Sequence, residues 1–238
     1  MDETQQQQTT SQHGVFPRRW RLLVIVVLCS GVLSQVGCSL FVMAGKAIFG
    51  DPKVPSAFRT ATGTNLAKSK RKVLVTCTTP ESIKIEFPSL DFDLLEGVAQ
   101  ILKGRGVRIV SPDDVATWMD DHGGFDEGDL AAVAEHFDAD FVVSINLERF
   151  TYQEENSPTL FRGRVNGEIT AFEVTTSKGG AASGQQVFVR AYTSVYPAFR
   201  PVSAENMSPK IFQKKYVDRV SAQIAELFYD HRLSEEIQ

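Results

Sequence analysis

The sequence predicts a single compact mixed-sheet α/β domain, with the element order β-α-β-α-α-β-β-β-α, behind an amino-terminal membrane anchor. Three observations lead to this prediction. An uncharged, mostly apolar run covers residues 22–45. Short apolar runs then alternate with helical stripes between residues 72 and 137. From residue 141 onward the apolar period changes from helical to strand-like alternation.

The anchor is predicted from the apolar run and from the basic stretch Arg18-Arg19-Trp20-Arg21 that precedes it. A run of this length can cross a bilayer core of about 30 Å. Arginines on its amino-terminal side hold that end in the cytoplasm, so the folded domain is expected on the extracytoplasmic, periplasmic side. Residues 1–21 are then a cytoplasmic tail or the basic region of a signal peptide.

Two interpretations of residues 22–45 give this same topology. The first is a permanent transmembrane helix from Leu22 to about Met43. The second is a lipoprotein signal peptide cleaved between Gly37 and Cys38, which would make Cys38 the lipidation site. Gln35 stands where such signals usually carry leucine. Under either interpretation the lipid bilayer is one partner of the protein.

Residues 46–71 read as a tether, because they mix Gly, Lys, Pro and single aromatic residues without a sustained period. The exported domain is expected at 72–232, followed by a tail at 233–238. A basic cluster, Lys68, Lys70, Arg71 and Lys72, lies where the tether meets the domain. It could contact anionic lipid headgroups or cell-wall polymer. Because the cluster has only four charges, an ordinary solvated linker is the favoured interpretation.

The first half of the domain alternates strands and helices. The continuous apolar run at 73–77 is typical of a strand that is buried on both faces, and a second strand is expected at 107–110. Helices are expected after Ser89 and Ser111, each beside a proline, and across residues 126–137. Strands joined through helices should lie parallel, with right-handed crossovers.

The second half is expected to be an antiparallel meander covered by a last helix. Its strands are predicted at 141–147, 161–175 and 187–196. The apolar phase of the second strand slips between Ala171 and Phe172, which indicates a bulge. Ser208-Pro209 begins the last helix, whose apolar stripe runs to Phe228.

The quoted elements resemble a known family. A lipoprotein-type start, the strand at 73–76, the segment 107–111 and above all Ala139-Asp140-Phe141-Val142-Val143 are similar to the TolB amino-terminal / CsgG / LpoB-like family of bacterial envelope lipoprotein domains. The chain departs from that family at Ser144 and Asn146, where the family usually has glycine. The resemblance implies a non-catalytic envelope domain that docks other proteins.

Catalysis is not expected from the motifs. The chain has no Gly-x-Ser-x-Gly, His-Glu-x-x-His, phosphate-loop or Cys-x-x-Cys pattern, and we expect no cofactor. The rival hypothesis is a metal-dependent or hydrolytic enzyme that uses the region from Asp113 to His122. Adjacent residues on a helix point in different directions, which disfavours a shared ion there. The net charge of −4 argues against nucleic acid as a partner.

Two loops are the candidate docking sites for another envelope protein. Residues 78–88 follow the carboxyl end of the first strand, where open α/β sheets tend to bind ligands. Residues 196–207 combine aromatic residues, arginine and proline, a mixture typical of interfaces. The candidate partner-binding residues are Thr79, Glu81, Phe87, Phe199 and Arg200. Arg162-Gly163-Arg164 could contact phosphate, although alternation along a strand explains it equally well.

Overall fold

The computed structural model describes residues 53–122, 130–176 and 182–232. The chain divides into two compact units, Met1–Pro52 and Lys53–Gln238, and every described element belongs to the second. The predicted anchor at 22–45, with Cys38, and the tail at 233–238 therefore lie outside the described residues. Within the described ranges, no helix is both long enough and apolar enough to cross a membrane.

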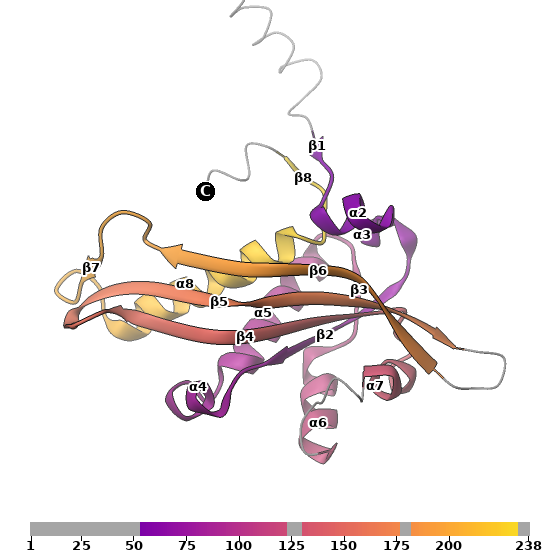
Figure 1. The fold of residues 1–238 in the computed structure, drawn as a ribbon, viewed down its shortest axis with the longest axis horizontal. Coiled ribbons are helices and arrows are strands. Elements are labelled where there is room, and N and C mark those ends of the chain that lie inside the picture. The colour runs from indigo at the N-terminus through magenta and orange to yellow at the C-terminus, as the bar shows by residue number, and fades with distance from the viewer. Residues whose placement is uncertain (1–52, 123–129, 177–181, 233–238) are drawn as a thin grey trace, which may run out of the picture. The chain divides into compact units, whose positions relative to one another are not determined.

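A six-stranded mixed sheet forms the centre of the second unit (Figure 1). Its strands lie in the order β3-β2-β4-β5-β6, and β7 pairs with the start of β5. β2 is parallel to β3 and β4, whereas β4, β5 and β6 are antiparallel, which confirms the predicted fold class. The strand bounds are β2 Lys72–Thr78, β3 Arg108–Ile109, β4 Phe141–Glu154, β5 Ser157–Thr176, β6 Ala182–Tyr196 and β7 Val202–Ser203.

Two long helices, α5 (Leu90–Gly104) and α8 (Pro209–Glu226), lie side by side on one face of this sheet, behind the strands in Figure 1. Their close approach requires a glycine, because a Cβ on Gly97 would lie 2.5 Å from the Ser221 hydroxyl oxygen. The predicted start of α8 is confirmed, since the Ser208 hydroxyl accepts a hydrogen bond from the Ile211 N–H at 3.4 Å. The shorter helices are α2 Ala57–Thr62, α3 Leu66–Ser69, α4 Glu81–Glu86, α6 Pro112–His122 and α7 Leu130–His136.

β4 is the middle strand, and its burial shows how the two faces of the sheet differ. The side chains of Phe141, Val143, Ile145 and Leu147 are buried on the face that carries α5 and α8. On the opposite face Val142 is buried, because α7 contacts this end of β4, β5 and β6. Farther along that face the side chain of Asn146 is exposed. One end of this second face is therefore covered and the other is open to solvent.

A bulge lies at the expected position between Ala171 and Phe172, but its extra residue is in β6 rather than in β5. Ala171 pairs with Phe188 on β6, whereas the next residue, Phe172, pairs with Gln186, so one residue of β6 is left over. The helix expected at 126–137 is present as α7 over its described part.

The segment assigned to a tether differs from the prediction where it is described. Residues 53–71 form β1 (Lys53–Val54), α2 and α3, and the Phe58 side chain is completely buried. Its ring centroid lies 5.5 Å from that of Phe141 on β4 and 5.6 Å from that of Phe228. Each of these short helices buries a single large apolar residue, Phe58 or Leu66. A single buried residue produces no periodicity, so the pattern in the sequence could not reveal it.

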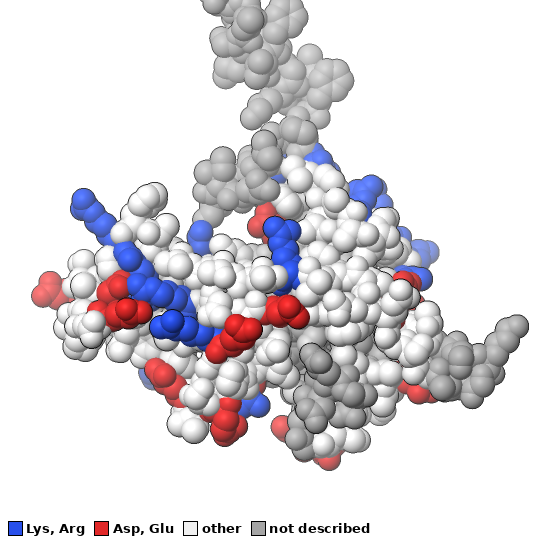
Figure 2. Space-filling model, viewed as in Figure 1, with Lys and Arg blue, Asp and Glu red and all other residues white. Residues whose placement is uncertain are grey.

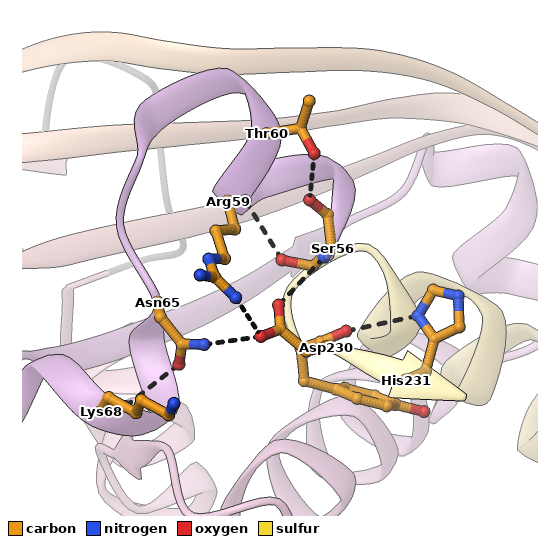
Figure 3. Close-up of polar contacts among 8 residues, drawn as sticks. Ser56, Arg59, Thr60, Asn65, Lys68, Asp230 and His231 are labelled. Atoms are coloured by element: carbon orange, nitrogen blue, oxygen red, sulfur yellow. Dashed lines mark hydrogen bonds and ion pairs between the residues drawn. The ribbon is translucent and has the colours of Figure 1, made fainter. Parts of the chain in front are cut away.

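A hydrogen-bonded cluster around Asp230 holds this segment to the end of the chain (Figure 3). The Asp230 carboxylate accepts from the Ser56 N–H at 3.1 Å and the Asn65 amide at 2.8 Å, and it forms an ion pair with Arg59. β1 also pairs with β8 (His231–Arg232). The fold of this unit therefore begins at Lys53 rather than at residue 72.

We expect Phe58→Ala to lower the free energy of unfolding by about 3–5 kcal/mol, because it empties a site enclosed by aromatic rings. Urea unfolding followed by circular dichroism measures this change. The control is Ile85→Ala on α4, whose side chain is 76% exposed and whose loss should cost less than about 0.5 kcal/mol. Wild-type stability in Phe58→Ala would mean that residues 53–71 are a tether after all.

Candidate functional site

The structure brings the two candidate loops to the same end of the sheet, the end where α4 and β7 lie in Figure 1. Aromatic contacts join them beneath the surface. The Phe87 ring, which ends the first loop, lies 5.1 Å from Phe150 and 5.5 Å from Tyr152 on β4. Tyr152 in turn contacts Phe161, which pairs with Val202 in the second loop. One aromatic cluster therefore supports both loops.

The first loop contains a helix, α4, and most of its predicted site residues serve the fold. Phe87 is 5% exposed and belongs to the core. Thr79 is also buried, and its hydroxyl donates a hydrogen bond to the Asp91 carboxylate at 2.6 Å. Of the three predicted site residues in this loop, only Glu81 has an exposed side chain. Ile85 on the same helix is exposed as well, although the sequence analysis did not single it out.

The second loop displays the most exposed large apolar side chain among the described residues. Phe199 is 93% exposed, and its neighbour Arg200 is exposed too. The backbone at this position is nevertheless held, because the Arg162 guanidinium donates a hydrogen bond to the Phe199 carbonyl oxygen at 2.6 Å. The structure therefore positions an aromatic ring in solvent, where it contributes nothing to the core.

The support of Phe199 extends across two strands. Glu154 on β4 contacts Arg162 at 3.2 Å and Arg164 at 2.6 Å, and both arginines come from β5. The hydrogen bond from Arg164, helped by the charges of both arginines, lowers the pKa of Glu154. Glu154 therefore stays ionised at neutral pH and keeps Arg162 in place beneath the loop.

Strand alternation explains why these two arginines lie together. Gly163, between them, points into the core, where a Cβ would lie 2.4 Å from the Tyr216 ring. The glycine thus allows Tyr216 to pack against the strand while Arg162 and Arg164 emerge on the other face. Burial of Tyr216 raises its pKa, and its hydroxyl donates a hydrogen bond to the Ser194 carbonyl oxygen at 3.2 Å.

Exposed large apolar side chains are concentrated at this end of the domain. Within the described ranges they are Ile85, Val189, Val195, Phe199 and Ile211. Ile85 lies within the first loop and Phe199 within the second, and Val195 and Ile211 lie close to the ends of the second loop, whereas Val189 lies farther back along β6. We call the group Glu81, Ile85, Val195, Phe199, Arg200 and Ile211 the loop-end surface. Clusters of exposed apolar side chains are typical of interaction sites.

The region of the rival enzyme hypothesis is arranged differently. Asp113, Asp114 and Asp121 on α6 are exposed, and within the described residues no three His, Cys, Asp or Glu side chains are placed so that they could hold one metal ion. The His122 ring stacks on Trp118 with 4.1 Å between centroids, and its Nδ1 lies 2.8 Å from the Trp118 carbonyl oxygen. The contacts of His122 described here are therefore made with another residue of the same helix, Trp118.

A cavity of about 370 Å³ lies at the carboxyl end of β2, between α5 and α6. Its lining includes Cys77, Lys84, Asp91 and Asp120. Burial, and to a lesser degree the charge of Asp91, raises the pKa of the Cys77 thiol, although Lys84 opposes this shift. A neutral thiol is a poor nucleophile. Asp91 already accepts the hydrogen bond from Thr79 and lies 3.7 Å from the Lys84 ammonium.

We expect Glu154→Gln to destabilise the protein at pH 7 and to lose this effect in acid. Because the folded-state pKa of Glu154 is lowered, its contribution is present above the ordinary glutamate pKa of about 4.3 and disappears as the pH falls through the lowered value. Thermal unfolding of both proteins between neutral and strongly acidic pH measures the difference. Glu155→Gln is the control, since Glu155 is 69% exposed and lies 3.6 Å from Arg149. A difference that does not depend on pH would contradict this account.

Comparison with known proteins places the chain near several solved structures at low identity. No protein-family model and no curated protein matches it. The PelC dodecamer from Paraburkholderia phytofirmans is similar at 14% identity and a TM-score of 0.42, over 76% of this chain and 97% of that chain. Lipoprotein GNA1162 from Neisseria meningitidis is similar at 14% identity and a TM-score of 0.37, over 65% and 98%. The hypothetical protein CT253 from Chlamydia trachomatis is similar at 12% identity and a TM-score of 0.37, over 67% and 98%. The similar structures thus include a bacterial lipoprotein, and the site described above rests on contacts within this chain alone.

Proposed function

We propose that this protein is a membrane-anchored accessory protein of the bacterial cell envelope, whose exported domain docks another envelope protein through the loop-end surface. The observation that carries the proposal is Phe199. Its ring is 93% exposed, yet its backbone is held by Arg162, which Glu154 holds in turn. An exposed aromatic side chain on a fixed loop adds nothing to the core, so a role in binding a partner explains it better than a role in folding.

The energetics of docking favour such an arrangement. Burying an aromatic side chain at the centre of an interface often contributes about 2 kcal/mol or more, and arginine is the other common anchor. Phe199 and Arg200 supply both on consecutive residues. The hydrogen bond at the Phe199 carbonyl reduces the conformational entropy that the loop would lose on binding.

The membrane part of the proposal rests on the amino-terminal sequence. Residues 22–45 carry no charge and follow three arginines, and Cys38 follows a small residue at the expected distance from the basic region. We propose lipidation of Cys38, with an uncleaved helix as the alternative. A bilayer is the partner in both cases.

The docking proposal is tested first by photo-crosslinking from position 199 in bacterial envelopes, and then by measuring the affinity of the purified partner. Phe199→Ala combined with Arg200→Ala should weaken that affinity by at least about 30-fold, which corresponds to about 2 kcal/mol. Thermal unfolding should change little, because neither side chain is in the core. The matched control is Val189→Ala with Arg190→Ala, an exposed pair on the same edge strand but away from the loops.

Undiminished affinity in the Phe199/Arg200 variant would show that the interface lies elsewhere on the domain. Loss of affinity in both double variants would show that the effect is not specific to the loop. Turnover of a substrate that survives this variant but is lost on substitution of Asp113, Asp121 or His122 would contradict the non-enzymatic proposal and favour the rival hypothesis.

The anchor is tested by the intact mass of the protein isolated from membranes. We expect loss of residues 1–37 and addition of acyl chains at Cys38, because lipoprotein processing begins the mature chain at the modified cysteine. Cys38→Ala should block this change and leave thermal unfolding of the domain as it is. A full-length, unmodified mass would instead identify residues 22–45 as a spanning helix.

A further inference from the structure

Basic side chains gather at the end of the sheet opposite the loop-end surface, where β2 begins. We call this group the basic pole, and it consists of Lys53, Arg59, Lys68, Lys70, Arg71, Lys103, Arg108 and Arg232. Lys53, the first described residue, belongs to it. The group comes from β1, α2, α3, the residues between α3 and β2, the end of α5, β3 and β8, so only the tertiary structure brings its members together.

Direct contacts show that these elements are neighbours. Lys53 pairs with Arg232 in the two-stranded sheet. The Arg108 guanidinium donates a hydrogen bond to the Lys70 carbonyl oxygen at 2.8 Å. The Arg105 guanidinium, two residues after Lys103, lies 4.4 Å above the Tyr229 ring, which places the end of α5 beside β8.

Two acidic residues of this region, Asp230 and Glu173, form ion pairs and Asp138 is exposed, while most of the cations face solvent. The Asp230 side chain is 16% exposed and is held by Ser56, Arg59 and Asn65 (Figure 3). Glu173 forms an ion pair with Arg71. By contrast, the exposed members are Lys53, Arg59, Lys68, Lys70, Lys103, Arg108 and Arg232. Figure 2 shows blue atoms around the start of the described chain.

The loop end of the domain carries charges of both signs, because Lys84, Arg200 and Lys210 are exposed there beside several acidic residues. Glu81 and Glu86 lie on α4, Asp93 lies in the first turn of α5, and Asp120 lies beside Asp91 at the cavity. The basic pole is distinguished by its position, since Lys53 is the residue at which residues 1–52 join the described domain.

We infer that the basic pole contacts the anionic lipid headgroups of the membrane that holds the anchor. The inference rests on the membrane anchor of the proposed function and adds the orientation of the domain. Between residue 45 and Lys53 the chain can span at most about 29 Å, and from Cys38 at most about 54 Å. Both tethers can bring the pole to the headgroups, where charges act over a Debye length of about 8 Å.

The Asp230 cluster gives this contact a defined geometry. It fixes α2 and α3 against the end of α8, so Arg59 and Lys68 are presented on a rigid surface (Figure 3). With the pole on the membrane, the loop-end surface at the other end of the sheet points away from the lipid. That orientation leaves Phe199 accessible to a partner that approaches from the other side.

Lysine footprinting of the full chain tests this inference. The protein is reconstituted in vesicles of phosphatidylcholine alone or of phosphatidylcholine with phosphatidylglycerol, labelled with an amine-reactive reagent and mapped by mass spectrometry. We expect labelling of Lys53, Lys68, Lys70 and Lys103 to fall several-fold on the anionic vesicles. Salt at about 1 M should restore it, since the Debye length is then about 3 Å. The exposed lysines Lys84, Lys210 and Lys214 are internal controls.

A charge-reversal variant supplies the matched comparison. Lys68→Glu with Lys70→Glu should abolish the protection of Lys53 and Lys103, whereas Lys214→Glu with Lys215→Glu on α8 should leave it intact. Equal labelling on the two kinds of vesicle, or protection of the control lysines instead, would overturn the inference while partner binding through Phe199 stands. Failure of the full chain to insert into either vesicle would overturn the anchor and this inference together.

Discussion

The packing of β4 is the constraint on which the rest of the structure depends. This strand is parallel to β2 on one side and antiparallel to β5 on the other, and its buried face sets the register of both pairs. Its first residue, Phe141, contacts Phe58 of the amino-terminal segment. Its later aromatic residues, Phe150 and Tyr152, contact Phe87 beneath the loop-end surface. One strand therefore connects the end of the domain where residues 1–52 join it with the end that carries the candidate docking site.

Carboxylates position neighbouring groups at both ends of the domain. At the start of β2 the acidic groups Asp230 and Glu173 are engaged in holding the fold, which leaves lysine and arginine side chains on the surface. At the other end Glu154 performs a related task by holding Arg162 beneath Phe199. In both places a carboxylate forms an ion pair that fixes a neighbouring group, and a different side chain is exposed to solvent. Binding surfaces built in this way are preorganised, and they lose little entropy when a partner binds.

The limits of pattern reasoning are clear at the two candidate loops. Residues 78–88 contain too few residues to show a helical period, so α4 and the burial of Phe87 could not be predicted. Phe87 and Phe199 are both aromatic residues in Pro-containing loops, yet one is 5% and the other 93% exposed. The difference arises because the end of β4 lies beneath Phe87, whereas the loop of Phe199 extends beyond β6.

The class of fold, the order of the main strands and helices along the chain and the capped start of α8 could be predicted from the sequence alone, because each depends on neighbouring residues or on a local period. The order of the strands within the sheet and the strand that carries the bulge depend on tertiary pairing. The sequence also predicted the anchor, since a long uncharged run needs no tertiary context to be recognised. The tertiary structure alone decided that Phe58 belongs to the core and that Asp230 holds the first helices. It alone collected the cations of the basic pole from six elements and from the residues between α3 and β2. These features join residues that are far apart in the chain, and such contacts leave no periodic signal in the sequence.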